Sequence, residues 1–270
     1  MADQQLSVPT NETTSLSLLK QYNVEDDFAS MRSRDVVLPT ARIMQMLSPE
    51  VVQGKAAHGD MVDKSTANIL FKAKTEKHAI VPFMMWLEWI EWNKVKTCPK
   101  NERIIERTTD PSSKLAKRSE AWETWKNNEG KEIPVVTEYY NFIVAFVTED
   151  YANYDDLYLL GFARSSHKIG KMWLNRMRKN KIKLDGEYIT PPMCAMRWAF
   201  KTAMVSNEAG QPYWIPSFGD GFQNPSGDLQ RLISISNSLK EQRKEIMERN
   251  TNKETDEEVH PTTVAANTEM

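Results

Sequence analysis

The chain has 270 residues, of which 40% are hydrophobic and 27% are charged, and its formal net charge is −2. This composition suits a globular protein with a sizeable core, and it excludes a global electrostatic attraction for nucleic acid. No apolar run reaches the roughly 18 residues that span a bilayer, and the N-terminus lacks the features of a signal peptide.

The residues that commonly bind metals or form disulfides are scattered. The two cysteines, Cys98 and Cys194, and the four histidines show no metal-site or disulfide spacing. The acidic stretches 59–63 and 149–156 have no phosphate-positioning motif beside them, so we do not expect Mg²⁺ there. We predict a cytoplasmic, non-catalytic binding protein without a cofactor.

Residues 1–30, rich in Thr, Ser, Asn and Gln, are predicted to be a flexible arm. A folded domain is expected over residues 31–225. Its strands are predicted from alternating or aromatic apolar runs at residues 36–47, 79–92, 138–147, 156–163, 193–205 and 212–218. The segment 207–211, N-E-A-G-Q, predicts a hairpin turn between the last two.

Two helices are expected. One begins at Ser165 or Ser166 and ends near Asn180, with an apolar stripe of Ile169, Met172, Trp173 and Met177. The C-terminal helix is predicted over residues 226–250, with its buried side formed by Leu229, Leu232, Ile233 and Leu239. The remaining residues, 251–270, are predicted to be a disordered acidic tail.

The order of these elements predicts a mainly β fold with helices, of the α+β class. Several antiparallel strands with one helix before the last hairpin follow the general plan of an OB-fold barrel. Residues 48–78 and 93–134 would be long insertions in that barrel, and the C-terminal helix would follow it.

A concentrated run of positive charge covers residues 164–183, which contain eight basic residues and no acid. We predict that phosphates lie along one face of this helix, with counterion release. A solvated helix face without a ligand is the alternative. The predicted nucleic-acid-binding residues here are Arg164, Lys168, Lys171, Arg176, Arg178, Lys179 and Lys181.

A second basic region spans residues 94–118 and contains the candidate phosphate-binding residues Lys114, Lys117 and Arg118. The D-P-S-S-K turn at 110–114 suggests a long polar loop. This loop either closes over a nucleic acid strand or is a surface loop without a ligand.

Aromatic residues near basic ones are candidates for base stacking. Trp122 and Trp125 lie in a polar context, and Trp198 alternates with Arg197 and Lys201 on an expected strand. Tyr213 and Trp214 follow in the hairpin. For each of these aromatic residues, packing in the core is the alternative.

Three stretches of the chain are similar to a known family. Leu38-Pro39, Arg42-Ile43, Gln45, S-P-E-V (48–51), G-K-A (54–56) and G-D (59–60) resemble the opening of bacteriophage single-stranded DNA-binding proteins. The hairpin 198–218 resembles the last hairpin of phage OB-fold proteins, and the acidic tail is similar to theirs.

The resemblance implies an OB-fold that coats single-stranded DNA during phage replication and recombination in the host cytoplasm. It also implies that the tail recruits replication or recombination proteins through Glu254, Asp256, Glu257 and Glu258. The negative charge of the tail could also compete with DNA for a basic groove.

Sequence-tolerant binding of single-stranded DNA is the leading hypothesis, and DNA is the expected partner. The alternative is a transcription accessory or protein-interaction module that acts through the acidic tail and the C-terminal helix. A structural virion protein is a third possibility. An enzyme is the last, because the residue types present assemble no catalytic motif.

Overall fold

The computed structural model describes residues 38–73, 78–93, 103–127, 130, 132–148, 153–184, 187–207 and 210–252. The chain divides into two compact units, residues 1–37 and 38–270, and the described residues all belong to the second. The expected arm at residues 1–30 therefore lies outside the described residues. So do the four acidic tail residues predicted to bind partners, Glu254, Asp256, Glu257 and Glu258.

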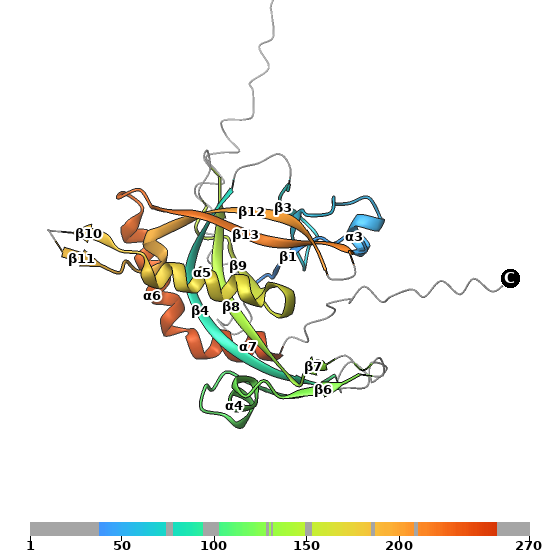
Figure 1. The fold of residues 1–270 in the computed structure, drawn as a ribbon. Coiled ribbons are helices and arrows are strands. Elements are labelled where there is room, and N and C mark those ends of the chain that lie inside the picture. The colour runs from blue at the N-terminus through green and yellow to red at the C-terminus, as the bar shows by residue number, and fades with distance from the viewer. Residues whose placement is uncertain are drawn as a thin grey trace, which may run out of the picture. The chain divides into compact units, whose positions relative to one another are not determined.

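A six-stranded antiparallel sheet forms the centre of the second unit (Figure 1). Its order is β13-β12-β4-β8-β9, and β5 pairs with the far part of β4. The bounds are β4 His78–Trp92, β5 Ile104–Thr108, β8 Val136–Val147, β9 Leu157–Phe162, β12 Met196–Ser206 and β13 Pro212–Gln223. β4 and β8 are paired from Ala79 opposite Val147 to Glu91 opposite Val136, and their aromatic and β-branched residues favour this extended form.

Shorter elements surround this sheet. The small sheets contain β1 Ala41–Ile43, β2 Met61–Asp63 and β3 Ile69–Phe71; β6 Thr124–Lys126 and β7 Glu132–Pro134; and β10 Ile182–Leu184 and β11 Glu187–Ile189. The α-helices are α3 Pro49–Val52, α4 Lys114–Glu120, α5 His167–Lys179, α6 Leu229–Glu241 and α7 Arg243–Asn252. Two 3-10 turns, η3 Arg164–Ser166 and η4 Met193–Ala195, precede α5 and β12.

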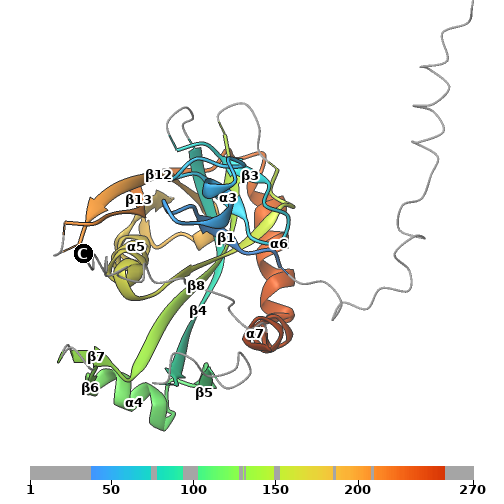
Figure 2. The same cartoon turned by 90° about the vertical axis from the view of Figure 1, so that its right-hand side faces the viewer.

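Alternate side chains of the sheet build a core on each of its faces. Phe142 and Val144 of β8 belong to the first core, which α5 covers, whereas Ile143 and Ala145 belong to the second. Leu232 and other apolar residues of α6 and α7 cover the second core. Figure 2 shows α5 and α6 on opposite sides of the β4–β8 pair.

The first core is centred on stacked aromatic rings. Trp173 of α5 stacks on Phe218 of β13, with ring centroids 4.0 Å apart and an angle of 11° between the planes. Phe162 of β9 lies 5.9 Å from the ring of Phe218 and 6.1 Å from that of Trp173. The helix thus joins the two ends of the sheet through side chains.

The strand order shows that the sheet does not close into the barrel that the sequence predicts. β9 and β13 end the sheet, and among the described strands no backbone pairing joins them. The aromatic rings of Phe162, Phe218 and Trp173 occupy the place where a closing ladder would bring two backbones together. The α+β class with an antiparallel sheet is confirmed.

Side chains cap the open edge of β13. The amide of Gln45 accepts from the backbone N–H of Trp214 and donates to its carbonyl, both at 2.8 Å. Arg176 donates to the carbonyl of Phe218 at 3.1 Å, and Pro216, between these two residues, has no N–H. At three alternate positions, part of the edge is therefore closed to a further strand: the Trp214 N–H and C=O and the Phe218 C=O are occupied, and the N–H of Pro216 is missing.

The far end of the β4–β8 pair carries a third, smaller core (Figure 2). Trp89 and Val136 of the strands pack there against Leu115 of α4. On this part of β4 the carboxylate of Glu88 is buried. It is bound by the guanidinium of Arg107 and by the side-chain amide of Asn141, the latter at 3.1 Å.

Most of the expected elements are confirmed, with three differences. Of the strand expected over 36–47, the structure describes residues 38–47, and β1 is the strand formed there, because the chain turns after Ile43 and Ser48 Oγ accepts from the backbone N–H of Gln45 at 2.9 Å. The strand expected over 193–205 begins at Met196, after a 3-10 turn. The C-terminal helix is interrupted at Gln242, and Ile233 is 41% exposed instead of buried.

Gly170 should be intolerant of a side chain, because a Cβ there would lie 2.7 Å from Cβ of Phe162. We expect Gly170→Val to lower the free energy of unfolding by about 2 kcal/mol or more through overpacking. Urea unfolding would measure this loss. Gly227→Ala is the control, since no atom lies within 4 Å of that position. Equal unfolding midpoints for the two variants would contradict this packing.

The buried ion pair gives a second stability prediction. Arg107→Ala would leave the Glu88 carboxylate buried with Asn141 as its remaining hydrogen-bond partner, and we expect a loss of about 3 kcal/mol in the same assay. Lys244→Ala is the control, because its 3.9 Å pair with Glu248 is exposed and contributes little. A wild-type midpoint for Arg107→Ala would show that the carboxylate is not held this way.

Candidate nucleic-acid interface

The helix α5 is positioned by one apolar side. Gly170, Trp173 and Met177 are buried, and Ile169 is half-buried and packs against the first core, which confirms three members of the expected stripe, Ile169, Trp173 and Met177. Met172, another expected member, is 49% exposed. Before the helix, Ser166 Oγ accepts from the Ala163 N–H at 3.1 Å and donates to the Ala163 carbonyl at 2.9 Å, which fixes the turn after β9.

The other side of α5 and the segment after it carry exposed cations: Lys168, Lys171, Arg176, Arg178, Lys179, Lys181 and Lys183. None of these seven forms an ion pair with a carboxylate in the part of the chain that the structure describes. Arg176 binds a backbone carbonyl and Lys181 the hydroxyl of Thr190, both neutral groups. Among the described residues, therefore, no carboxylate cancels this positive charge.

Arg164 differs from these cations, because it is already engaged. Its guanidinium lies over the ring of Trp92, 5.7 Å from the centroid, and its backbone has a φ of +48°. The cation–π contact ties the turn before α5 to the end of β4.

A hairpin that the sequence analysis did not name as a site extends this basic surface. β10 and β11 pair only with each other among the described strands, and Tyr188 lies directly opposite Lys183. Tyr188 is 72% exposed, so the ring is available for stacking. The sequence I-K-L-D-G-E-Y-I, in which alternation surrounds an Asp-Gly pair, is a hairpin signal that could have found it.

The second predicted basic region lies elsewhere. Figure 2 shows α4, β6 and β7 at one end of the β4–β8 pair, and α5 further along it. Lys114 and Lys117 are exposed on α4, and Trp122, at its C-terminal end, is 69% exposed with a φ of +52°. Trp125 is half-buried and packs against the third core.

The structure contradicts the prediction that Arg118 binds phosphate. Its guanidinium donates to Glu123 at 2.6 Å and 3.1 Å and to Glu91 at 2.5 Å and 3.1 Å. Hydrogen bonds to Glu123 and then to Glu91 raise the pKa of Arg118. The residue stabilises the packing of α4 on β4, and its charge is already neutralised.

The three candidate nucleic-acid-binding residues on β12 lie on two different faces of the strand. Trp198 is 4% exposed and belongs to the first core. The prediction that its ring is open for base stacking is therefore wrong. Arg197 and Lys201 alternate with Trp198 and lie on the opposite face of the strand, away from α5. The structure therefore does not bring them together with the cations of α5.

The aromatic residues of the last hairpin are partly covered. Tyr213 and Trp214 are both half-buried. The ring of Trp214 lies directly over Gly59, where a Cβ would be 2.7 Å from the ring, and His58 lies 5.7 Å from its centroid. One face of Trp214 is therefore closed to a base.

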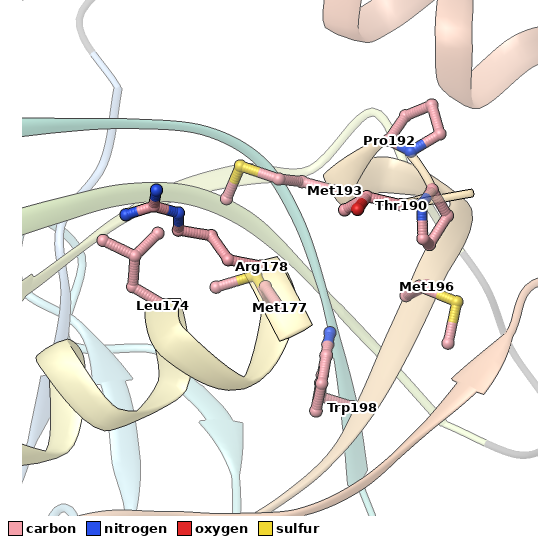
Figure 3. A pocket seen from close by; sticks show the side chains of 9 residues that line it. Leu174, Met177, Arg178, Thr190, Pro192, Met193, Met196 and Trp198 are labelled. Atoms are coloured by element: carbon pink, nitrogen blue, oxygen red, sulfur yellow. The ribbon is translucent and has the colours of Figure 1, made fainter. Parts of the chain in front are cut away.

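A small pocket lies at the C-terminal end of α5 (Figure 3). Its volume is about 100 Å³, and its wall is formed mainly by Met177, Met193, Met196 and Trp198. Arg178 and Thr190 provide its polar groups.

The carboxylates of residues 59–63, where the sequence predicts no Mg²⁺ site, have partners within the protein. Asp60 accepts from the backbone of Ala57 and Ala73 at 2.9 and 3.0 Å. Burial would raise the pKa of Asp63, but hydrogen bonds from Ser65 and Thr66 outweigh it and lower the pKa. Within the described ranges no group of three or more His, Cys, Asp or Glu side chains could hold a metal ion.

No helix in the described part of the chain combines the length and the apolar composition that a membrane span requires.

Comparison with known proteins gives one family: residues 11–245 match the model of the Pam3 phage gp34-like protein family. No curated protein and no solved structure matches the chain. Because the match covers most of the sequence, this is a phage protein that belongs to the Pam3 phage gp34-like family.

Proposed function

We propose that this protein binds single-stranded DNA without sequence preference and coats it during phage replication or recombination. The observation that carries the proposal is the exposed basic face of α5, where no described carboxylate neutralises the cations. A flexible polyanion is the natural partner for such a surface, because each bound phosphate releases counterions.

Aromatic rings beside the cations favour a single strand over a duplex. Unpaired bases stack on exposed rings, whereas the bases of a duplex are not accessible for stacking. Tyr188 is the exposed ring nearest to the basic segment in sequence, and Lys183 lies opposite it in the hairpin. The buried side of α5 packs against the sheet, so the cations on its other side are presented without reorganisation of the core.

The strand pairing supports an OB-type plan as part of the proposal. β4 pairs with both β8 and β12, β9 follows β8, and α5 lies in the chain before the β12–β13 hairpin. OB-folds are partly open five-stranded barrels that bind nucleic acid across the face of their second and third strands. The face of β8 that carries Ile143 and Ala145 is covered by α6 and α7. We therefore place the phosphates along α5 instead.

A protein-binding role is the second candidate, and one observation favours it. Met46, Leu47 and Met204 are each more than half exposed. They lie close together, because Met204 is opposite Trp214 and Gln45 is hydrogen-bonded to Trp214. Exposed apolar patches mark protein contacts. This candidate predicts no affinity for nucleic acid at low salt, together with stable co-purification of a partner protein.

Charge reversal on α5 tests the leading proposal. The triple variant Lys168→Glu, Lys171→Glu and Arg178→Glu should weaken binding of every single-stranded DNA alike. It should also reduce the slope of log K against log salt by about 2, since each phosphate contact contributes about −0.7. Gel shifts with single-stranded DNA, single-stranded RNA and duplex across a salt series would measure both effects.

The matched control is Lys201→Glu, Lys240→Glu and Lys244→Glu, which changes the net charge equally at exposed positions on β12, α6 and α7. Its affinity should remain close to that of the wild-type protein. If both triple variants lose affinity to the same extent, net charge and not the α5 face controls binding, and the proposed site is wrong.

Tyr188 should contribute by stacking and not by charge. We expect Tyr188→Ala to weaken binding of single-stranded DNA by roughly 5- to 100-fold, the range for loss of one base–aromatic stack, with an unchanged salt slope. Tyr188→Phe should retain the affinity, because it keeps the ring. Fluorescence anisotropy at fixed salt would measure both; wild-type affinity in Tyr188→Ala would remove this residue from the interface.

A further inference from the structure

The pocket at the end of α5 combines apolar walls with a buried donor that has no partner in the described structure. Trp198 is 4% exposed, and its indole N–H has no hydrogen-bond partner in the described structure. Figure 3 shows the indole nitrogen on the edge of Trp198 nearer to Met177, and the guanidinium of Arg178 further along the helix beside Leu174. An indole N–H can only donate, so a complementary ligand must bring an acceptor.

The size of the pocket limits what can enter. Its volume of about 100 Å³ is smaller than the roughly 150 Å³ cavity that holds a benzene ring, so only one edge of a ring can be buried there. Methionine side chains are flexible, and Met177, Met193 and Met196 can shift to let such an edge reach the indole.

The surroundings of the pocket point to a nucleotide. Arg178 belongs to the unpaired basic face of α5 and also lines the pocket. A ligand that puts an acceptor edge against Trp198 and an anion against Arg178 satisfies both groups. A base attached to its phosphate backbone has this combination.

We propose that this pocket binds the thymine edge of single-stranded DNA. Thymine carries a methyl group beside the O4 acceptor, whereas cytosine has an amino donor in the place of O4. The methyl group would contact the methionines, and O4 would accept from the indole N–H of Trp198. The amino group of cytosine would oppose that donor. The inference rests on the proposed function and adds to it a local preference for thymine within sequence-tolerant binding.

Oligonucleotides of dT, dU and dC test the two contacts separately. With strands of about 12 nucleotides, within the usual site sizes, anisotropy should show dT binding more tightly than dU by about four-fold, the effect of one buried methyl group. It should show dT binding more tightly than dC by about five-fold or more, the effect of the hydrogen bond. Equal affinities would overturn the inference.

Variants assign these preferences to the pocket. Trp198→Phe removes the N–H and keeps a ring, so it should lose the preference for dT over dC and retain that over dU. Thr190→Trp, at an exposed position that lines the pocket, should narrow it and abolish both preferences without disturbing the core. Trp173→Phe is the control, because that indole N–H is also buried without a partner but does not line the pocket.

The outcomes separate this inference from the proposed function. If all three oligonucleotides bind equally and charge reversal on α5 weakens them all, the protein binds DNA along α5 and the thymine pocket is wrong. If no oligonucleotide binds at low salt, the proposed function itself fails. A dT preference that persists unchanged in both Trp198→Phe and Thr190→Trp would also reject the pocket.

Discussion

The stack of Trp173 on Phe218 is the contact on which the rest of the structure depends. It attaches α5 to β13, and the nearby ring of Phe162 brings β9 into the same cluster. Because Gly170, Trp173 and Met177 commit one side of α5 to this core, its lysines and arginines are left on the outer side. One hydrophobic contact therefore determines both how the sheet ends and where the positive charge is displayed.

A chain with 37 acidic and 35 basic residues can still present a cationic surface, because acidic and basic side chains are concentrated on different parts of the structure. Glu88 and Glu91 on β4 are paired with Arg107 and Arg118, close to the third core. Interactions between exposed charges are screened over about 8 to 10 Å at physiological salt, so such pairs do not cancel a distant field. The surface of α5 therefore acts on its surroundings independently of the net charge.

The parts of the fold that depend on local pattern could be predicted from the sequence. β4, β8 and β9 and the helix α5 follow from alternation and helical spacing within a single segment, and the α+β class follows from their order. The fate of Trp198 and Arg118 could not be predicted in this way. Whether Trp198 is covered depends on the helix that packs on its strand. Arg118 is bound by Glu123, which is near in sequence, and by Glu91, which is 27 residues away and is brought to it by the packing of α4 on β4. The hairpin that carries Tyr188 could be predicted from its local Asp-Gly pattern, because that signal lies within a single segment.

The caps on the edge of β13 bear on how two copies of the protein could associate. Gln45 and Arg176 occupy the backbone groups that an adjacent copy would need for a continuous intermolecular sheet, and Pro216 withholds another. Two copies therefore cannot extend the sheet across these positions by regular backbone pairing. Copies that meet there must do so through side chains, and the capped positions oppose the edge-to-edge pairing from which cross-β stacking grows.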